Sequence, residues 1–150
     1  MQTIFGLLDR SANMLAQALE ARLVETGLTA QEALVLRVVS ENTDVDIARL
    51  RAAVGLRRST TSSLLARLEG RGYVVRKPGG PDARFRVVEP TRVGAQLARI
   101  AWAVQQELEE ELGGSVGPAE VAALEKISSA ILRLPPVEID PRDGLPISTA

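Results

Sequence analysis

Cysteine and histidine are both absent from the 150 residues of this sequence. A chain without cysteine forms no disulfide bond, carries no thiol redox sensor and offers no thiolate to a metal ion. A chain without histidine lacks the commonest general base and the commonest ligand of transition metals. These absences exclude most hydrolase and metal-sensor mechanisms, and we expect no catalytic residue, no metal site and no cofactor.

Long hydrophobic runs are missing as well. No apolar stretch approaches the roughly 20 residues needed to cross a bilayer, and the start "MQTIFGLLDR" lacks the basic segment and small-residue cleavage site of a signal peptide. We therefore expect a cytoplasmic protein with no membrane partner. The composition, 45% apolar and 25% charged, is typical of a globular protein. The length suits one domain, or one domain with a helical extension.

The net charge of −1 conceals a segregation of sign along the chain. The segment from Arg49 to Arg92 holds eleven basic and three acidic residues, whereas the rest holds seven basic and sixteen acidic ones. A basic middle between acidic ends indicates one anion-binding face on an otherwise acidic body. The alternative is an ordinary solvated charged surface.

Apolar residues at helical spacing predict six helices. They are expected at residues 4–24, from the cap Thr29 to "ENTD", from the cap Asp46 to about Val54, at residues 57–70, from the cap Thr91 to Gly113, and from Pro118 to before Pro135. Two β-prone runs, "YVVRK" and "RFRVVE", are joined by "PGGPDA" and predict a hairpin. The predicted fold class is mainly α with a small β-hairpin wing.

Several of these helices carry recognisable signals. Thr29 and Glu32 form a capping box, and Gly55 makes a tight turn between the third and fourth helices, which is the helix-turn-helix arrangement. The buried side of the second helix is expected to comprise Leu34, Val35, Val38 and Val39, and that of the sixth Val121, Leu124, Ile127 and Ile131.

The fourth predicted helix begins with two arginines and five consecutive hydroxyl side chains, "RRSTTSSLL". Serine and threonine are mediocre helix formers, because their hydroxyls compete for backbone hydrogen bonds. Helical spacing gives an inward set of Thr61, Leu64, Leu65 and Leu68, and an outward set of Arg58, Ser59, Ser62 and Ser63, with Thr60 at the edge.

An outward row of short hydroxyls suits a helix that enters the major groove of DNA. Short side chains let the backbone approach the duplex, bond to base edges or phosphates, and leave the positive end of the helix dipole unobstructed. Arginines add phosphate attraction or bidentate contact with guanine. The alternative is that these hydroxyls are only helix caps and exposed surface.

The segments "LTAQEALVL", "LEGRGYVVR" and "DARFRVVEPTRVG" together resemble the multiple-antibiotic-resistance regulator (MarR) family of winged-helix transcription factors, over roughly residues 4–134. The most specific part is the wing signature, which Asp82, Arg84, Thr91 and Gly94 match. In that family the wing arginine enters the minor groove and the aspartate helps to hold the wing. The resemblance implies these two roles for Arg84 and Asp82.

The residues expected to contact DNA lie on the fourth helix and on the wing. They are Arg57, Arg58, Ser59, Thr60, Ser62, Ser63, Arg67, Arg84 and Arg86. The resemblance further implies a homodimer in which the first, fifth and sixth helices of both chains interlock, so that the operator is an inverted repeat. The alternative is a monomer in which the terminal helices fold back as a cap.

The resemblance also predicts how the chain is divided. Residues 1–136 form the MarR-type domain, with a DNA-binding lobe at about 29–90 and dimerisation helices at about 3–26 and 91–134. Residues 137–150, which carry two prolines, are expected to be a flexible tail.

Members of the family are commonly released from DNA by small aromatic or anionic molecules, bound between the DNA-binding lobe and the dimer helices. Trp102, on the fifth predicted helix, is the candidate effector-binding residue in this sequence. The alternative for a lone tryptophan is packing in the core or at the dimer interface.

We therefore expect a dimeric, sequence-specific transcription regulator that binds double-stranded DNA, a repressor released by a small-molecule effector. A winged-helix module for protein–protein contact would keep the fold but would not need an arginine-rich wing. An enzyme working with carboxylates alone would use "ELEEEL", whose adjacent glutamates on one exposed helix normally form a solvated face. Salt-dependent binding to duplex DNA distinguishes the first hypothesis from the other two.

Overall fold

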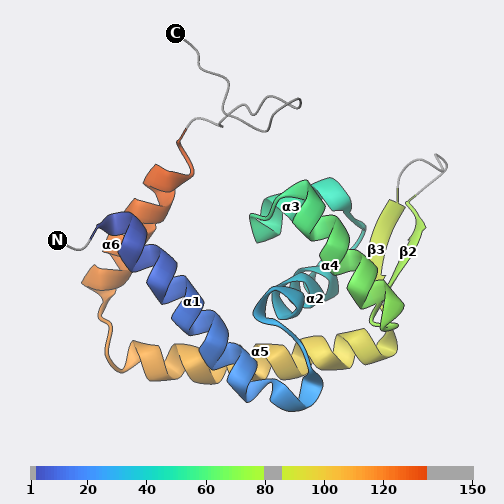
Figure 1. Cartoon of the computed structure of the whole chain (residues 1–150), viewed down its shortest axis with the longest axis horizontal. Helices are drawn as coiled ribbons and strands as arrows, with labels where there is room; N and C mark the ends of the chain where they lie inside the picture. Colours follow the sequence, from blue (N-terminus) through green and yellow to red (C-terminus); the bar gives the residue numbers. More distant parts are fainter. Residues whose placement is uncertain (1–2, 80–85, 135–150) are drawn as a thin grey trace, which may run out of the picture. The chain divides into compact units, whose positions relative to one another are not determined.

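The computed structural model describes residues 3–79 and 86–134 (Figure 1). The elements in chain order are α1 (Ile4–Arg22), the 3-10 helix η1 (Val24–Thr26), α2 (Ala30–Glu41), β1 (Val45–Asp46), α3 (Ile47–Val54), α4 (Arg58–Gly70), β2 (Val74–Pro78), β3 (Arg86–Pro90), α5 (Arg92–Gly113) and α6 (Pro118–Ile131). The predicted fold class, mainly helical with a small β-hairpin, is confirmed. The chain divides into two compact units, Met1–Glu110 and Glu111–Ala150.

The predicted helix caps of the first unit are present. Thr29 Oγ1 accepts from Glu32 N–H at 3.2 Å, while Glu32 Oε2 accepts from Thr29 N–H at 3.0 Å, which completes the capping box. Asp46 caps α3 by accepting from Arg49 N–H at 2.7 Å. Each cap satisfies backbone donors that the first helical turn leaves without partners.

The turn between α3 and α4 is the predicted one. Gly55 ends α3 with φ of 66°, a left-handed conformation that disfavours side chains with a Cβ. Helix α4 begins at Arg58, with Arg57 as its N-cap residue. These two helices form the predicted helix-turn-helix.

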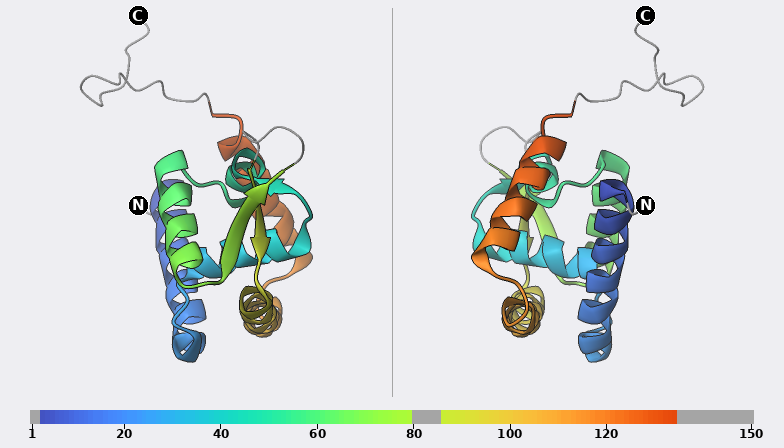
Figure 2. Two further views of the ribbon diagram at one scale, coloured as in Figure 1. Left: turned by 90° about the vertical axis from the view of Figure 1, so that its right-hand side faces the viewer. Right: turned by 90° about the vertical axis from the view of Figure 1, so that its left-hand side faces the viewer.

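The sheet has three strands rather than the two that the sequence predicted. Its order is β1-β3-β2 and all pairs are antiparallel, with Val45 opposite Val88 and Val74 opposite Pro90. In Figure 2 (left), α4 stands beside the strands and α5, seen end on, passes beneath them. β1 was missed because a strand of two residues has no alternation to detect.

The main hydrophobic core lies between the helix-turn-helix and the sheet. It joins residues from α2, α3, α4, the strands and α5: Leu28, Val35, Leu36, Val38, Val39, Val45, Leu50, Leu64, Leu65, Leu68, Val74, Val88 and Ala98. A second cluster joins α1, α2 and α5 through Leu19, Leu23, Ala33, Ala101 and Leu108. Of the residues expected on the buried side of α2, Leu34 is only half-buried, whereas Leu36 is fully buried.

Helix α5 begins after Thr91, which forms hydrogen bonds with the segment that connects α4 to β2. Thr91 Oγ1 donates to Gly72 O at 2.7 Å and accepts from Gly94 N–H at 3.1 Å, so Thr91 caps α5 as predicted. A Cβ built on Gly94 would lie 1.8 Å from the carbonyl oxygen of Tyr73. Only glycine permits this close approach, which explains the threonine–glycine spacing of the wing signature.

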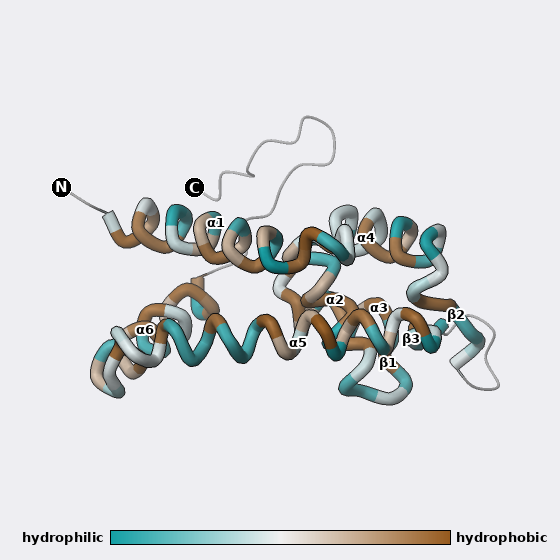
Figure 3. The backbone as a smooth tube through the Cα atoms, turned by 90° about the horizontal axis from the view of Figure 1, so that it is seen from below, coloured by the Kyte–Doolittle hydropathy of each residue, from teal (hydrophilic) through white to brown (hydrophobic). Residues whose placement is uncertain are grey.

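In the second unit, α6 contains no buried residue. The expectation that its apolar residues are buried is therefore wrong for the isolated chain: Val121, Leu124 and Ile131 are each close to half exposed. In the first unit, α1 likewise exposes Phe5 (79%) and Met14 (58%). Figure 3 shows hydrophobic residues recurring along both helices. Neither apolar surface is covered by the part of the chain that the structure describes.

Among the described residues, no helix is both long enough and apolar enough to cross a bilayer.

Candidate nucleic-acid interface

The two sides of α4 differ as the sequence predicted. Thr61, Leu64, Leu65 and Leu68 are at most 2% exposed, and Thr61 Oγ1 donates to Arg57 O at 3.0 Å. The outward side carries the predicted DNA-contacting residues: Arg57, Arg58, Ser59, Ser62, Ser63 and Arg67 are exposed, and Thr60 is half-buried. The hydroxyls that weaken the helix intrinsically are therefore gathered on one solvent-facing side.

The N-terminus of α4 is open to an outside acceptor. Arg57 provides no side-chain cap, and the first helical bond runs from Thr61 N–H to Arg57 O at 2.9 Å. The preceding amides of the first turn point out of the helix end, where the helix dipole favours an anion. A phosphate placed there would meet these amides together with the guanidinium groups of Arg57 and Arg58.

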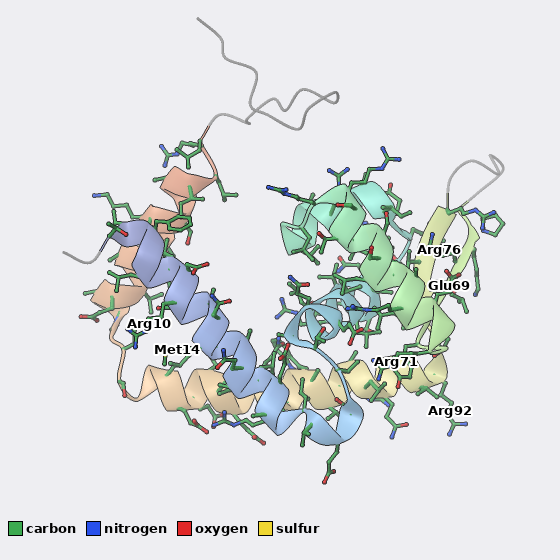
Figure 4. The ribbon with its side chains drawn as sticks, viewed as in Figure 1. Arg10, Met14, Glu69, Arg71, Arg76 and Arg92 are labelled. Atoms are coloured by element: carbon green, nitrogen blue, oxygen red, sulfur yellow. The ribbon has the colours of Figure 1, made fainter. Side chains whose placement is uncertain are left out.

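The structure describes the two wing strands, β2 and β3, but not residues 80–85 between them. Arg86, the first residue of β3, is exposed as predicted. The two wing residues assigned by resemblance, Asp82 and Arg84, lie outside the described residues. Arg76 of β2 lies 3.1 Å from Glu69 of α4 as an ion pair, which fastens the wing strand to the helix (Figure 4).

A group of charges that the sequence did not reveal lies at the other end of α4. The carboxylate of Glu32 on α2 is 3% exposed and pairs with Arg67 Nε at 3.2 Å and Arg71 Nη1 at 3.3 Å. Arg71, labelled in Figure 4, also donates to Gly27 O and Thr26 O, at 3.2 and 3.3 Å. The partners are 35 to 45 residues apart in the chain, so no local spacing indicates them.

The candidate effector residue lies beside a hollow between α2 and α5. The hollow has a volume of about 300 Å³ and is lined by Arg37, Ser40, Glu41, Ala98, Arg99 and Trp102. The Trp102 side chain is 42% exposed, and the Arg37 guanidinium carbon lies 5.5 Å from the centre of its ring. Trp102 is therefore not a core residue of the single chain. Within the described residues, the buried Arg37 Nε makes no hydrogen bond.

The "ELEEEL" segment lies at the C-terminal end of α5. Glu107, Glu109 and Glu110 are exposed on α5. In the part of the chain that the structure describes, no three acidic residues come close enough together to hold a metal ion.

Known proteins resemble this chain in sequence and in fold. The model of the MarR family matches residues 26–84, which span α2 to the wing. The transcriptional regulator HosA of Escherichia coli O157:H7 is 30% identical over 94 residues, or 62% of this chain and 69% of that protein.

Two solved structures extend the similarity to the whole fold. The structure of CouR from Rhodococcus jostii RHA1 bound to p-coumaroyl-CoA has 28% identity and a TM-score of 0.76, over 91% of this chain and 96% of that one. The structure of the M. tuberculosis transcriptional regulator MOSR in complex with DNA has 27% identity and a TM-score of 0.71, over 89% of this chain and 100% of that one. The chain belongs to the MarR family of DNA-binding transcription regulators.

Proposed function

We propose that this protein acts as a homodimeric repressor that reads an inverted-repeat operator with α4 and is released from it by a small aromatic or anionic effector. The observation that carries the proposal is the two-sided character of α4. Its inner side packs into the hydrophobic core, whereas its outward hydroxyls and arginines are exposed and can contact another molecule. Short hydroxyl side chains allow close approach to base edges, and the arginines provide the phosphate attraction.

The role of the wing follows from its arginines. Arg86 is exposed at the start of β3, and Arg84 is assigned to the minor groove, where electrostatic attraction dominates over base reading. Asp82 is assigned to hold the wing. In this arrangement the wing supplies affinity and α4 supplies sequence preference.

The dimer is supported by the apolar side chains that a single chain leaves exposed. Phe5, Met14, Val121 and Leu124 are between 48% and 79% exposed. Exposed apolar surface of this extent is typical of an interface. A second copy of the chain would cover it and present two α4 helices to successive major grooves.

The proposed effector site is the hollow beside Trp102. Arg37 and Arg99 would attract an anion, and Trp102 and Ala98 offer apolar contact to an aromatic ring. Because the hollow lies between α2 of the DNA-binding lobe and α5, a bound molecule would act on the position of the lobe. The function requires no catalysis by this chain and assigns it to the cytoplasm, where its DNA target lies.

Binding-site selection from a random duplex library, followed by fluorescence anisotropy at several salt concentrations, tests the DNA-binding part. We expect an inverted repeat to be selected. The variant Arg84→Ala should weaken binding to most sequences and lower the log–log salt slope by about one. Arg92→Ala is the matched control, because Arg92 is exposed at the start of α5, on the opposite side of the first unit from the N-terminus of α4 (Figure 4). An unchanged affinity and salt slope in Arg84→Ala would favour the protein-interaction module instead.

A further inference from the structure

One of the predicted DNA-contacting arginines is already held within the protein. Arg67 projects from the exposed side of α4, with 58% of its side chain exposed, yet its Nε lies 3.2 Å from Glu32 Oε1. The contact uses the inner nitrogen of the guanidinium group. The two terminal amino groups, which form the fork that grips phosphate, have no other partner among the described residues.

The Glu32 carboxylate, which pairs with Arg67, is itself held in place. Glu32 is 3% exposed, and its second oxygen, Oε2, accepts from Thr29 N–H at 3.0 Å and from Arg71 Nη1 at 3.3 Å. A carboxylate with these contacts has little freedom to rotate. It therefore presents Oε1 to Arg67 in one orientation.

Arg71 connects the Glu32 carboxylate to the segment that precedes α2. Its guanidinium group donates to Gly27 O and Thr26 O, and lies 4.7 Å from the centre of the Tyr73 ring. On the α1 side, Glu20 Oε1 accepts from Ala30 N–H at 2.8 Å. The C-terminal end of α4 is thereby tied to the junction of α1 and α2.

We propose that Glu32 is a positioning residue for DNA binding: it holds Arg67 by Nε, so that the terminal amino groups of that arginine face the phosphate backbone beside α4. The inference rests on the proposed DNA-binding function. A free arginine must lose side-chain entropy when it grips a phosphate. An arginine that is already oriented loses less, and so contributes more to the affinity.

A double-mutant cycle on operator affinity tests the proposal. The proteins are the unaltered chain, Glu32→Gln, Arg67→Ala and the double variant, each titrated by fluorescence anisotropy with the selected operator. Glutamine retains an oxygen to accept from Thr29 N–H but removes the charge that holds Arg67. We expect Arg67→Ala to weaken binding on the order of tenfold and to lower the salt slope by about one. Glu32→Gln should weaken binding severalfold, and the double variant should bind no worse than Arg67→Ala.

Two further variants show whether a change in operator affinity comes from the positioning of Arg67, from the change of net charge, or from a loss of stability. Glu25→Gln, at an exposed site of η1, makes the same change of charge and should leave the affinity unchanged. Arg67→Lys keeps the charge but has no inner nitrogen to pair with Glu32, so it should lose nearly as much affinity as Arg67→Ala. This variant tests the proposal even if Glu32→Gln folds poorly, which thermal unfolding would reveal.

The possible results are distinct. Additive losses in the cycle, tighter binding by Glu32→Gln, or full affinity in Arg67→Lys would overturn the positioning role while leaving DNA binding intact. Failure of the unaltered chain to prefer any duplex would overturn both this inference and the proposed function.

Discussion

Helix α4, of 13 residues, and helix α6, of 14 residues, differ in whether their apolar side chains are buried. Helix α4 buries its leucines within the chain and exposes hydroxyls and arginines, whereas α6 buries nothing and exposes Val121, Leu124 and Ile131. An exposed row of polar donors suits a charged, hydrogen-bonding partner. An exposed apolar stripe suits a partner with the same kind of surface. The proposed partners of the two helices therefore differ: DNA for α4 and a second copy of the chain for α6.

The largest expected effect comes from placing charge on the apolar side of α6. The double variant Val121→Glu and Leu124→Glu should convert the dimer into monomers, because buried unpaired carboxylates oppose association. Operator affinity should fall by about 10²–10⁴-fold, since each lobe then binds its half-site alone. Sedimentation velocity and anisotropy measure the two changes. The control is the double variant Ala122→Glu and Ser129→Glu, which adds the same two charges on the opposite side of the helix. An intact dimer in Val121→Glu/Leu124→Glu would contradict the assignment of α6 to the dimer interface.

The inner side of α4 should determine stability. Leu65 is fully buried, so Leu65→Ala should lower the free energy of unfolding by about 2–5 kcal/mol through lost burial and a residual cavity. Chemical denaturation monitored by circular dichroism provides the measurement. A loss below about 1 kcal/mol would mean that this side of α4 is not packed as described.

The outer side of α4 should determine sequence preference instead. Ser62→Ala should change the free energy of unfolding by no more than about 0.5 kcal/mol, because Ser62 is exposed. Changing the hydroxyl that reads a base should relax preference at one position per half-site, at a cost of roughly 1–3 kcal/mol for the best sequence. Site selection with Ser62→Ala, Ser63→Ala and Thr60→Val would identify that hydroxyl. Unaltered preference in all three variants would limit α4 to contacts with the backbone.

The smallest expected effect is spectroscopic. If a compound that releases DNA occupies the hollow beside Trp102, it displaces water from the ring and alters the contact with Arg37, so the fluorescence of this single tryptophan should change. Titration with small aromatic acids, in parallel with anisotropy of the operator complex, follows both events. Fluorescence that stays constant with every releasing compound would assign Trp102 to packing at the dimer interface.

Features set by neighbouring residues were predictable from the sequence. The capping box of Thr29 and Glu32, the cap at Asp46 and the inward set of α4 all depend on contacts within one or two helical turns. The same holds for the turn at Gly55, which depends on local backbone conformation.

Features set by distant residues were not predictable. The ion pairs of Glu32 join residues more than 30 positions apart, and the capping box already gave Glu32 a sufficient local explanation. The close approach of Gly94 to the Tyr73 carbonyl likewise depends on tertiary packing. The apolar stripe of α6 was recognised correctly, but its burial depends on a partner that the sequence of one chain does not contain.

The central position of β3 in the sheet has a mechanical consequence. Val87 of β3 lies opposite both Lys77 of β2 and Asp46 of β1, and Asp46 is also the residue that caps α3. A displacement of β2 or β3 should therefore be passed through Val87 and Asp46 to the first turn of α3. The wing strands and the helix-turn-helix should consequently move together as one rigid body. The contacts of Thr91 with Gly72 and Gly94 connect this body to the start of α5.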